Sequence, residues 1–452
     1  MTTLLRRSWR AIPLRLFVIF LAIYGLTAGV SVGRHSLAPH FVYLAESFLH
    51  GHLDLMHVPD PPYDLTPFEG QWYVSFPPLP ALLMLLPVAI RGLAVSDIAF
   101  SVVLGALNIT LFWTILARLE VGDWRLQIGL CVLLGLGTPL WYCAAFGSVW
   151  YTAHVAAITC LCFYVLEVVG RNRPWLAGLC LGLGFLARAP VLLTFPLSLV
   201  LGFQKSQDIQ RRTRFLLLFA FGMAPALLGQ AAYNWARFGN PLEFGYRWMN
   251  SPGPLLARQM TWGQFSLHFL PENLYTLLIR PPLVSLTPLR IEPDPWGMGL
   301  LFTCPALLLA LPALTLPPDP SPRVEGGAGW GLEREGVPTG QGWARALRLG
   351  LWLSVGLVQI PSLLYFNTGS YQFGYRFALD WMPLGVLLVA LGVDDLRCVK
   401  GRRCSKALVI TLTILIVASV LMHLWGVSWM YPNFNGRLWH LQYVELVERL
   451  LR

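Results

Sequence analysis

Long runs of apolar residues, separated by short polar stretches, recur along nearly the whole chain. Runs of about 18 residues have the length of a helix that crosses a bilayer, and they lack the alternation of membrane-barrel strands. The pattern therefore predicts an all-α polytopic membrane protein with about eleven transmembrane helices. The expected spans lie near residues 16–33, 99–117, 126–146, 149–168, 175–188, 190–203, 214–235, 297–316, 347–367, 377–393 and 407–429.

At three apolar segments, the sequence does not decide whether the chain crosses the membrane. Segments 175–188 and 190–203 are short and joined by the sequence ARAP, so they could form a broken helix pair that reaches the outer face and turns back. Segment 80–95 could count as a further span, but this would put the basic residues Arg118 and Arg125 outside. We expect instead a helix that lies in the interface or dips partway into the membrane.

Composition and charge agree with a membrane protein. Hydrophobic residues make up 56% of the chain and charged residues only 12%, against about 25% charged in soluble domains. The net charge of +10 does not indicate nucleic-acid binding, because the basic residues cluster in short loops between apolar runs. By the positive-inside rule, we expect a multi-pass protein of the plasma (inner) membrane, with a cytoplasmic N-terminus and an extracytoplasmic C-terminus.

This topology divides the chain into three parts. Residues 1–235 form a transmembrane module whose long first loop, 34–98, lies outside the cytoplasm. Residues 236–296 form a second extracytoplasmic segment. Residues 297–452 supply the C-terminal helices, interrupted by a Gly- and Pro-rich cytoplasmic loop, 319–346, that we expect to be flexible.

The first loop holds an unusual density of acidic residues. Four of the 23 acidic residues of the chain are Asp54, Asp60, Asp64 and Glu69, and Glu46 lies just upstream. Carboxylates at a membrane surface can act as a general base or as metal ligands. They can also be the solvated side chains of a loop that avoids the positive side of the membrane.

Histidines gather in the same loop. Five of the nine lie between positions 35 and 57, among them His40, His50 and His52. In the pattern His50-x-His52-x-Asp54, an extended backbone would put all three side chains on one face, where they could hold a divalent metal. This spacing is common by chance, and nothing else in the sequence requires a metal or another cofactor.

Three arginines stand out because aromatic or apolar residues surround them. Arg188 interrupts an apolar stretch, and Arg247 and Arg376 occupy matching places in the short repeats EFGYRW and QFGYRF. A planar guanidinium suits a phosphate, and aromatic rings beside it could stack on a sugar or an isoprenoid. Snorkelling and interfacial aromatic belts would look similar. His154, Tyr375 and Glu46 could line the same cavity.

Sequence motifs for soluble energy-rich substrates are missing. The chain has no Walker motif, no dinucleotide fingerprint, no serine elbow and no zinc-type Cys/His spacing. The expected cytoplasmic loops are too short to hold a nucleotide-binding domain. An energy-rich substrate would therefore have to arrive through the membrane.

The residues of the first half resemble a known superfamily. A first span followed by an acidic loop with YLAESFLHG, then WYVSFPPLPALLMLLP, then the broken pair LARAPVLLTFP, is similar to the GT-C membrane glycosyltransferases. The likeness is to the branch of protein O-mannosyltransferases and lipid A aminoarabinose transferases. It covers residues 1–235 in organisation and the rest more loosely, and it implies a GT-C-like bundle.

The resemblance also implies a reaction. Such enzymes take a sugar from a polyprenyl-phosphate donor and transfer it, with inversion, to a hydroxyl of a protein, lipid or glycan acceptor of the cell envelope. A loop aspartate is the general base, and basic side chains bind the departing lipid phosphate. Arg188, Arg376 and Arg247 are the residues of this chain that we expect in the second role.

One departure from the family pattern leaves the identity of the general base undecided. The acidic pair expected before Tyr43 is replaced by SLAPHFVY, which has His40 but no carboxylate. The base could be Asp64, which we favour because its loop leads into the helix that would line the cavity. Asp54, Asp60 or His40 could also serve. A flippase or transporter of lipid-linked sugars and a non-catalytic scaffold for envelope assembly remain alternatives.

Overall fold

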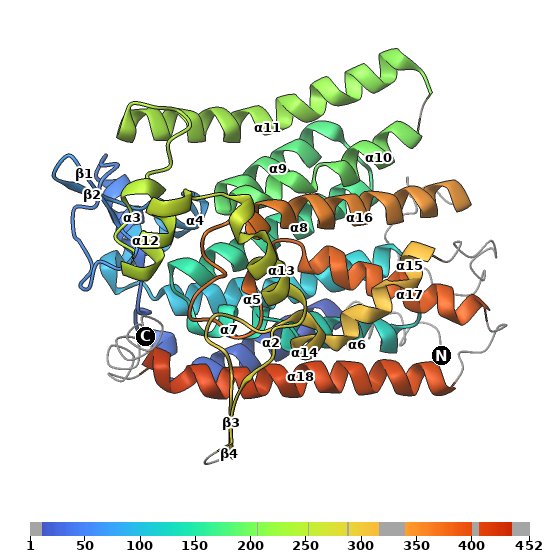
Figure 1. Cartoon of the computed structure of the whole chain (residues 1–452). Helices are drawn as coiled ribbons and strands as arrows, with labels where there is room; N and C mark the ends of the chain where they lie inside the picture. The colour runs from blue at the N-terminus through green and yellow to red at the C-terminus, as the bar shows by residue number, and fades with distance from the viewer. Residues whose placement is uncertain are drawn as a thin grey trace.

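The computed structural model describes residues 11–205, 207–251, 253–286, 289–315, 340–399 and 406–435. Within these ranges the regular structure is almost entirely helical, and two short hairpins are the only sheets. Figure 1 shows the long helices running side by side, with the hairpin of β1 and β2 at one end of the bundle. Most of the expected cytoplasmic loop 319–346 lies outside the described residues.

Six helices in the described ranges are long and apolar enough to cross a membrane. A seventh candidate is the pair α6 and α7, which is bent by 57° at its break. These helices occupy positions expected from the sequence and confirm an integral, all-α membrane protein. The bounds are Ile12–Ala28 for α2 with Gly29–Gly33 for η1, Asp97–Arg118 for α5, Trp124–Leu136 for α6, Leu140–Phe146 for α7, Val149–Val169 for α8, Ile209–Phe238 for α11, Gln341–Leu364 for α16 and Lys406–Asn435 for α18.

The remaining apolar segments form shorter helices. They are α4 (Leu79–Arg91) with η2 (Gly92–Ala94), α9 (Pro174–Ala187), η3 (Ala189–Thr194) with α10 (Pro196–Gln204), α14 (Leu300–Thr303), η6 (Pro305–Ala310), α15 (Pro312–Thr315) and α17 (Met382–Val399). At its 13 residues, α4 is about 20 Å long, less than the roughly 30 Å of a hydrocarbon core. This length agrees with a helix that does not cross fully. All eleven expected segments are helical, but the number of eleven crossings is not established.

Local signals in the sequence explain where several helices begin. Ser96, Asp123 and Asp208 each accept a hydrogen bond from a backbone N–H in the first turn of α5, α6 and α11. These side chains satisfy donors that have no partner within the helix. Proline at the start of α9 and α10 costs no hydrogen bond there, because its missing N–H would be unpaired anyway.

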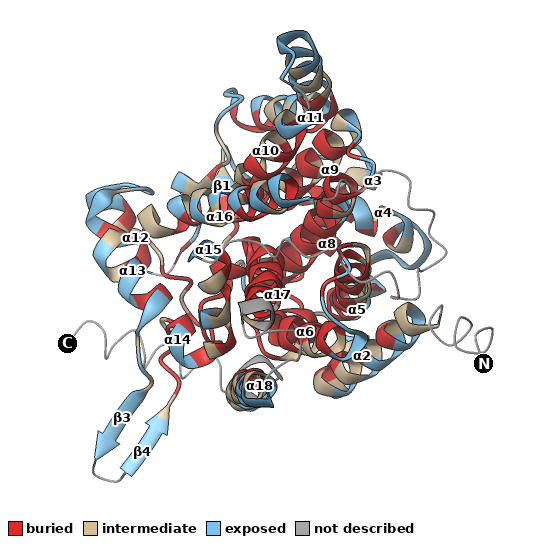
Figure 2. Ribbon diagram, turned by 90° about the vertical axis from the view of Figure 1, so that its right-hand side faces the viewer, coloured by how far each residue is buried: buried red, intermediate tan, exposed pale blue. Residues whose placement is uncertain are grey.

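Helix α8 lies at the centre of the packing. In its most apolar stretch, 83% of the residues are buried, compared with 22% for α2, α11 and α18. It packs against α5, α7 and α9. Figure 2, which looks along the bundle, shows buried residues concentrated on α8, α17 and the facing side of α5. The outer helices present apolar side chains outward, as helices in contact with lipid do.

Helices α9 and α11 approach closely through glycine. A β-carbon at Gly178 would collide with the carbonyl oxygen of Phe219, and one at Gly222 would collide with that of Trp175. Small residues at such a crossing let two helix backbones come together, which is the usual way that membrane helices gain contact. The short helix α9 is thereby fixed against the long helix α11.

Loop elements cap one end of the bundle. The first loop contributes α3 (His40–Leu49), β1 (Thr66–Phe68), β2 (Gln71–Tyr73) and α4, and α3 and α4 share a separate apolar cluster against which Trp72 of β2 packs. The second segment contributes η4 (Tyr246–Trp248), α12 (Gly253–Trp262), η5 (Leu267–Phe269), α13 (Leu270–Leu278), β3 (Leu283–Leu286) and β4 (Leu289–Glu292). The two segments join where Asn250 N–H donates to the Leu65 oxygen at 2.7 Å and Asp64 N–H donates to the Asn250 oxygen at 3.2 Å.

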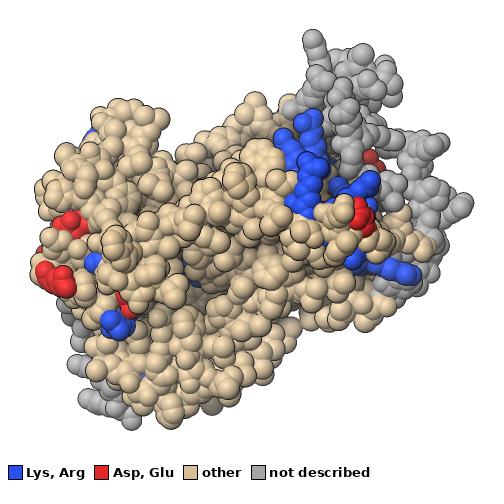
Figure 3. Space-filling view, turned by 90° about the horizontal axis from the view of Figure 1, so that it is seen from above, with Lys and Arg blue, Asp and Glu red and all other residues tan. Residues whose placement is uncertain are grey.

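Charged side chains separate along the molecule. Figure 3 shows basic side chains over the start of α11 at one end of this face, and acidic side chains mainly at the opposite end. This separation agrees with the clusters seen in the sequence. The orientation of the two ends in the membrane stays a prediction.

Candidate functional site

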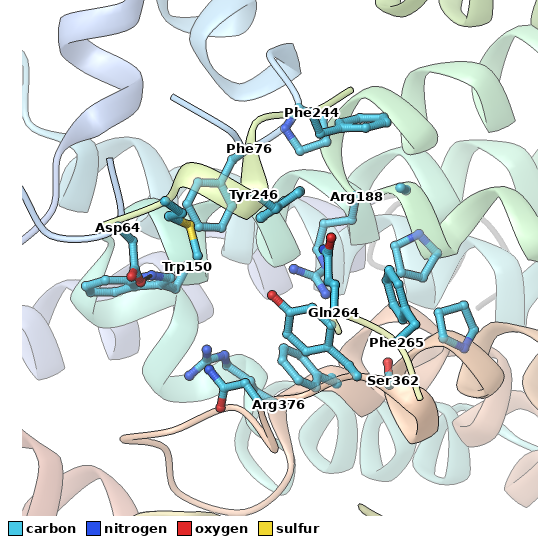
Figure 4. A pocket seen from close by; sticks show the side chains of 18 of the residues that line it. Asp64, Phe76, Trp150, Arg188, Phe244, Tyr246, Gln264, Phe265, Ser362 and Arg376 are labelled. Atoms are coloured by element: carbon cyan, nitrogen blue, oxygen red, sulfur yellow. Dashed lines mark hydrogen bonds between the residues drawn. The ribbon is translucent and has the colours of Figure 1, made fainter. Parts of the chain in front are cut away.

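A cavity of about 710 Å³ lies where the two loop segments meet the helices. Its volume is within the range of sites for small molecules and cofactors. Aromatic and aliphatic side chains form most of its wall, and Figure 4 shows them around one open space. The charged side chains that line it are Asp64, Arg188, Glu243, Arg247 and Arg376. The cavity therefore brings together four of the residues that the sequence singled out.

Asp64 enters the cavity from the first loop. Its φ of 51° lies in the left-handed region, which aspartate adopts more readily than most residues. Trp150 Nε1 donates to Asp64 Oδ2 at 2.7 Å, and Figure 4 shows the indole beside the carboxylate. Burial raises the pKa of Asp64 to about 6, although the Trp150 bond and the charge of Arg376 both favour the carboxylate. Asp64 is therefore a carboxylate near neutral pH that can still accept a proton.

Arg376 begins η7 (Arg376–Asp380) and is held by the backbone of its own loop. Its side chain donates from Nη1 to the Gly369 oxygen at 2.7 Å, and its backbone N–H donates to Gln372 Oε1 at 2.9 Å. The guanidinium carbon lies 5.7 Å from the ring centroid of Tyr151. Among the described residues it forms no ion pair, and its buried Nε has no partner. A buried cation that forms no ion pair is suited to an anionic ligand.

Arg188 is placed differently, because a buried acid compensates its charge. It follows α9, and it pairs with Asp380 through two bonds, Nε to Oδ1 at 2.7 Å and Nη2 to Oδ2 at 3.0 Å. His154 Nδ1 lies 3.0 Å from Asp380 Oδ1. The Asp380 and His154 side chains are fully buried, whereas Arg188 lines the cavity. The fork of Arg188 is therefore fixed in orientation by Asp380.

The two FGYR repeats are related in local structure but not in surroundings. Gly245 and Gly374 both have positive φ, 89° and 67°, and each precedes a short 3₁₀ helix. Arg247 is largely exposed, pairs with Glu243 at 3.3 Å and stacks on Trp248 at 4.0 Å. The sequence repeat thus places one arginine at the rim of the cavity and the other in its wall.

Other predicted residues lie outside the cavity lining. Tyr375 is buried and accepts a hydrogen bond from Gln359, and His154 lies behind Arg188. Glu46 is not part of the lining, and its carboxylate lies 2.9 Å from Nδ1 of the exposed His57. His40 is buried, with Nε2 2.6 Å from the Tyr63 oxygen.

The pKa of His40 falls to about 4 because burial disfavours its charged form. A neutral, enclosed imidazole bonded to the residue before Asp64 is better placed to hold the loop than to serve as the base. Asp54 and Asp60 also do not line the cavity. Of the four candidate bases, only Asp64 does.

The expected metal candidates do not form a metal site in the described residues. His52 Nδ1 lies 3.4 Å from Asp54 Oδ1, while His50 bonds the Glu46 backbone oxygen at 2.9 Å. His50 ends α3 rather than continuing as a strand, so the alternation that would align three ligands is lost. No group of three or more His, Cys, Asp or Glu side chains is placed to hold a metal ion within these ranges.

Sequence reasoning missed two residues of the site, Trp150 and Asp380. Asp380 lies only four residues after Arg376 in an apolar context, which is the kind of signal that marked Arg188. Trp150 gave no such signal, because tryptophan is common at membrane interfaces.

The hydrogen bond from Trp150 to Asp64 should affect the pH dependence of an activity that requires the Asp64 carboxylate. If Asp64 must be ionised, kcat/KM rises with pH through a pKa of about 6 in the free protein. Trp150→Phe removes a hydrogen bond that favours the carboxylate, so the acidic limb is expected to move to higher pH. A pH–rate profile measures this shift, and a limb that stays in place in the variant would contradict it.

No protein-family model matches the chain. No curated protein matches it either.

Solved structures give three matches of low identity. The apo oligosaccharyltransferase of Archaeoglobus fulgidus is 15% identical, with a TM-score of 0.48, over 93% of this chain and 56% of its own. AglB of A. fulgidus, in complex with an inhibitory peptide and a dolichol-phosphate, is 14% identical, with a TM-score of 0.44, over 92% and 55%. ArnT of Cupriavidus metallidurans, bound to undecaprenyl phosphate, is 11% identical, with a TM-score of 0.46, over 91% and 76%.

This chain thus spans little more than half the length of the two archaeal proteins. Because the TM-scores are below 0.5, these matches carry no argument about the cavity. Its chemistry is inferred from its own geometry. Two of the matched proteins are oligosaccharyltransferases, and the third is ArnT.

Proposed function

We propose that this protein transfers a sugar from a polyprenyl-phosphate donor to an acceptor hydroxyl, with inversion at the anomeric carbon. The observation that carries the proposal is the shared cavity, which combines a carboxylate of raised pKa, Asp64, with the uncompensated Arg376 on a largely apolar wall. An amphiphilic donor needs such a combination: a cation for its phosphate and apolar surface for its lipid. The acceptor is a hydroxyl of a protein, lipid or glycan.

The charges of the cavity favour a donor with one phosphate. Asp380 compensates Arg188, and Glu243 pairs with Arg247. Among the described lining residues, Arg376 then remains as the cation without an ion-pair partner, and Asp64 as the carboxylate without one. A sugar phosphodiester carries one negative charge, which one such cation balances, whereas a diphosphate linkage would bring a second charge.

The reaction follows from these positions as a single displacement. Asp64 accepts the proton of the acceptor hydroxyl. At the same time, the hydroxyl oxygen attacks the anomeric carbon of the sugar on the face opposite the phosphate. The bond from this carbon to the phosphate oxygen breaks, and the electron pair stays on the phosphate. Arg376, assisted by Arg188, binds the growing negative charge. The products are an inverted glycoside and polyprenyl phosphate, and Asp64 returns its proton to water.

The other functions considered fit the site less well. A transporter is expected to place ionisable residues near the middle of the membrane. Here the charged side chains of the cavity lie where two loop segments cap the bundle. A scaffold gives no reason for Asp64, Arg188 and Arg376 to line one cavity. We infer that the cavity opens on the extracytoplasmic side of the plasma membrane.

A reconstituted assay tests the proposed function. The full chain in lipid vesicles is supplied with a panel of polyprenyl-monophosphate sugars, with matching diphosphate-linked sugars, and with hydroxyl acceptors. Transfer is expected from a monophosphate donor, with product of inverted configuration, and the same rate with and without chelator. Flipping of the donor without transfer would support a transporter, and inactivity with every donor would support a scaffold.

A further inference from the structure

The hairpin of β3 and β4 projects away from the helical bundle. The strands are antiparallel, and Val284 is opposite Ile291 while Leu286 is opposite Leu289. Figure 1 shows the hairpin pointing across the direction of the long helices, and Figure 2 shows it as an exposed arm at the side of the bundle. An isolated two-stranded hairpin is at best marginally stable in water. Its exposed surface therefore calls for something that covers it.

The two faces of the hairpin differ in chemistry. Residues directly opposite in an antiparallel pair share a face, so one face consists of Val284, Leu286, Leu289 and Ile291. Their exposed fractions are 58%, 80%, 75% and 55%. The other face carries Leu283 at the start of β3, together with Ser285 and the ion pair of Arg290 with Glu292, whose Nη2 and Oε1 atoms lie 2.6 Å apart. The hairpin is amphipathic, with its apolar face uncovered.

The hairpin leads along the chain into helices that also expose apolar side chains. Directly after the hairpin, α14 and η6 pack against α18 and expose Leu301, Phe302 and Leu308 on their other side. These side chains are 44%, 43% and 45% exposed and belong to short apolar helices. The chain passes from this surface to the hairpin within eight residues, from Glu292 to Leu300.

We propose that the β3–β4 hairpin lies on the lipid surface beside the bundle, with the face of Val284, Leu286, Leu289 and Ile291 turned toward the acyl chains. The open strand edges and the Arg290–Glu292 pair then meet the headgroups, since neither belongs in the hydrocarbon interior. A lipid surface needs no shape match to a single apolar face, and the helices that follow the hairpin in the chain also expose apolar side chains.

The base of the hairpin is bonded to the loop that holds Arg376. Gln372 N–H donates to the Pro295 oxygen at 3.1 Å, and Met298 N–H donates to the Gly374 oxygen at 3.0 Å. The side chain of Gln372 in turn accepts from the backbone N–H of Arg376. A hairpin seated on the membrane thus fixes the height of Arg376 relative to the headgroups, where the donor phosphate lies. The lipid contact stands without the proposed transfer reaction, and only this consequence rests on it.

Photo-crosslinking of the full chain tests the contact. A benzophenone side chain is placed singly at Val284 or at its neighbour Ser285, both exposed, and the protein is reconstituted in vesicles of phosphatidylethanolamine and phosphatidylglycerol. Position 284 is expected to give several-fold more covalent lipid adduct than position 285, because successive residues of a strand face opposite ways. Mass spectrometry of the intact protein separates lipid adducts from protein adducts.

Three results would overturn the proposal: no lipid adduct at position 284, equal adducts at both positions, or crosslinks from position 284 to a second copy of the chain. A second pair of probes, at Leu289 and Arg290 on the partner strand, must repeat the difference. Because the readout is an adduct and not activity, it stays informative if the transfer reaction itself is disproved.

Discussion

Asp64→Asn is expected to lower the rate of sugar transfer by about 10²- to 10⁴-fold, the range that a positioned general base contributes. The amide has nearly the same shape as the carboxylate, and its oxygen can still accept the hydrogen bond of Trp150. The loop should therefore keep its conformation. Donor binding is expected to stay close to that of the unchanged protein, so the loss should appear in kcat measured in vesicles.

Two neighbouring acids of the same loop serve as matched controls. Asp54 and Asp60 lie outside the cavity lining, so Asp54→Asn and Asp60→Asn are expected to change the rate little. If Asp64→Asn retains full activity, or if Asp54→Asn or Asp60→Asn loses as much as Asp64→Asn, then Asp64 is not the base. If all three variants lost both their activity and their thermal stability, the cause would be a folding defect of the loop.

Arg376→Ala is expected to weaken use of the donor by about 30-fold to several thousand-fold in kcat/KM. This corresponds to the roughly 2–5 kcal/mol that truncation of a buried hydrogen-bonded charge pair costs. Without Arg376 the donor phosphate would face a cavity whose other arginines are already paired with acids. Donor titration in the vesicle assay measures the effect.

Arg247→Ala is the matched control for this variant. Arg247 occupies the corresponding place in the other FGYR repeat but is largely exposed, and exposed ion pairs contribute little. We expect at most a few-fold change in donor use. Equal losses in the Arg376 and Arg247 variants would contradict the assignment of the phosphate to Arg376. Arg376→Lys should recover part of the activity, because it restores the charge but not the planar fork.

Much of the fold could be predicted from apolar periodicity. A run of apolar residues must become a membrane helix because no other conformation satisfies its backbone in lipid, and all eleven expected runs are helical. The number of crossings could not be obtained this way. Segments such as α9, with 14 residues, are short for a span, and their depth depends on tertiary contacts such as the glycine crossing with α11.

The candidate site was predictable where a charge stood out from its surroundings. Arg188 was found because a cation within an apolar stretch is costly, and Arg376 because it lies in the repeated FGYR segment; both line the cavity. The ion pair of Arg188 with Asp380 could not be predicted from the sequence, because 192 positions separate the two residues. The metal hypothesis assumed an extended backbone through His50, whereas α3 runs up to that residue.

The central helix α8 links these distant groups. Trp150 bonds Asp64, the ring of Tyr151 lies beside Arg376, and His154 supports Asp380 behind Arg188. If Asp64 accepts the proton and Arg376 binds the phosphate, as we propose, then about one turn of a single helix sets the distance between the two groups, although they come from remote parts of the chain. A shift of this turn would displace both groups at once, so we expect a bulky lipid to be admitted by the surrounding loops and not by α8.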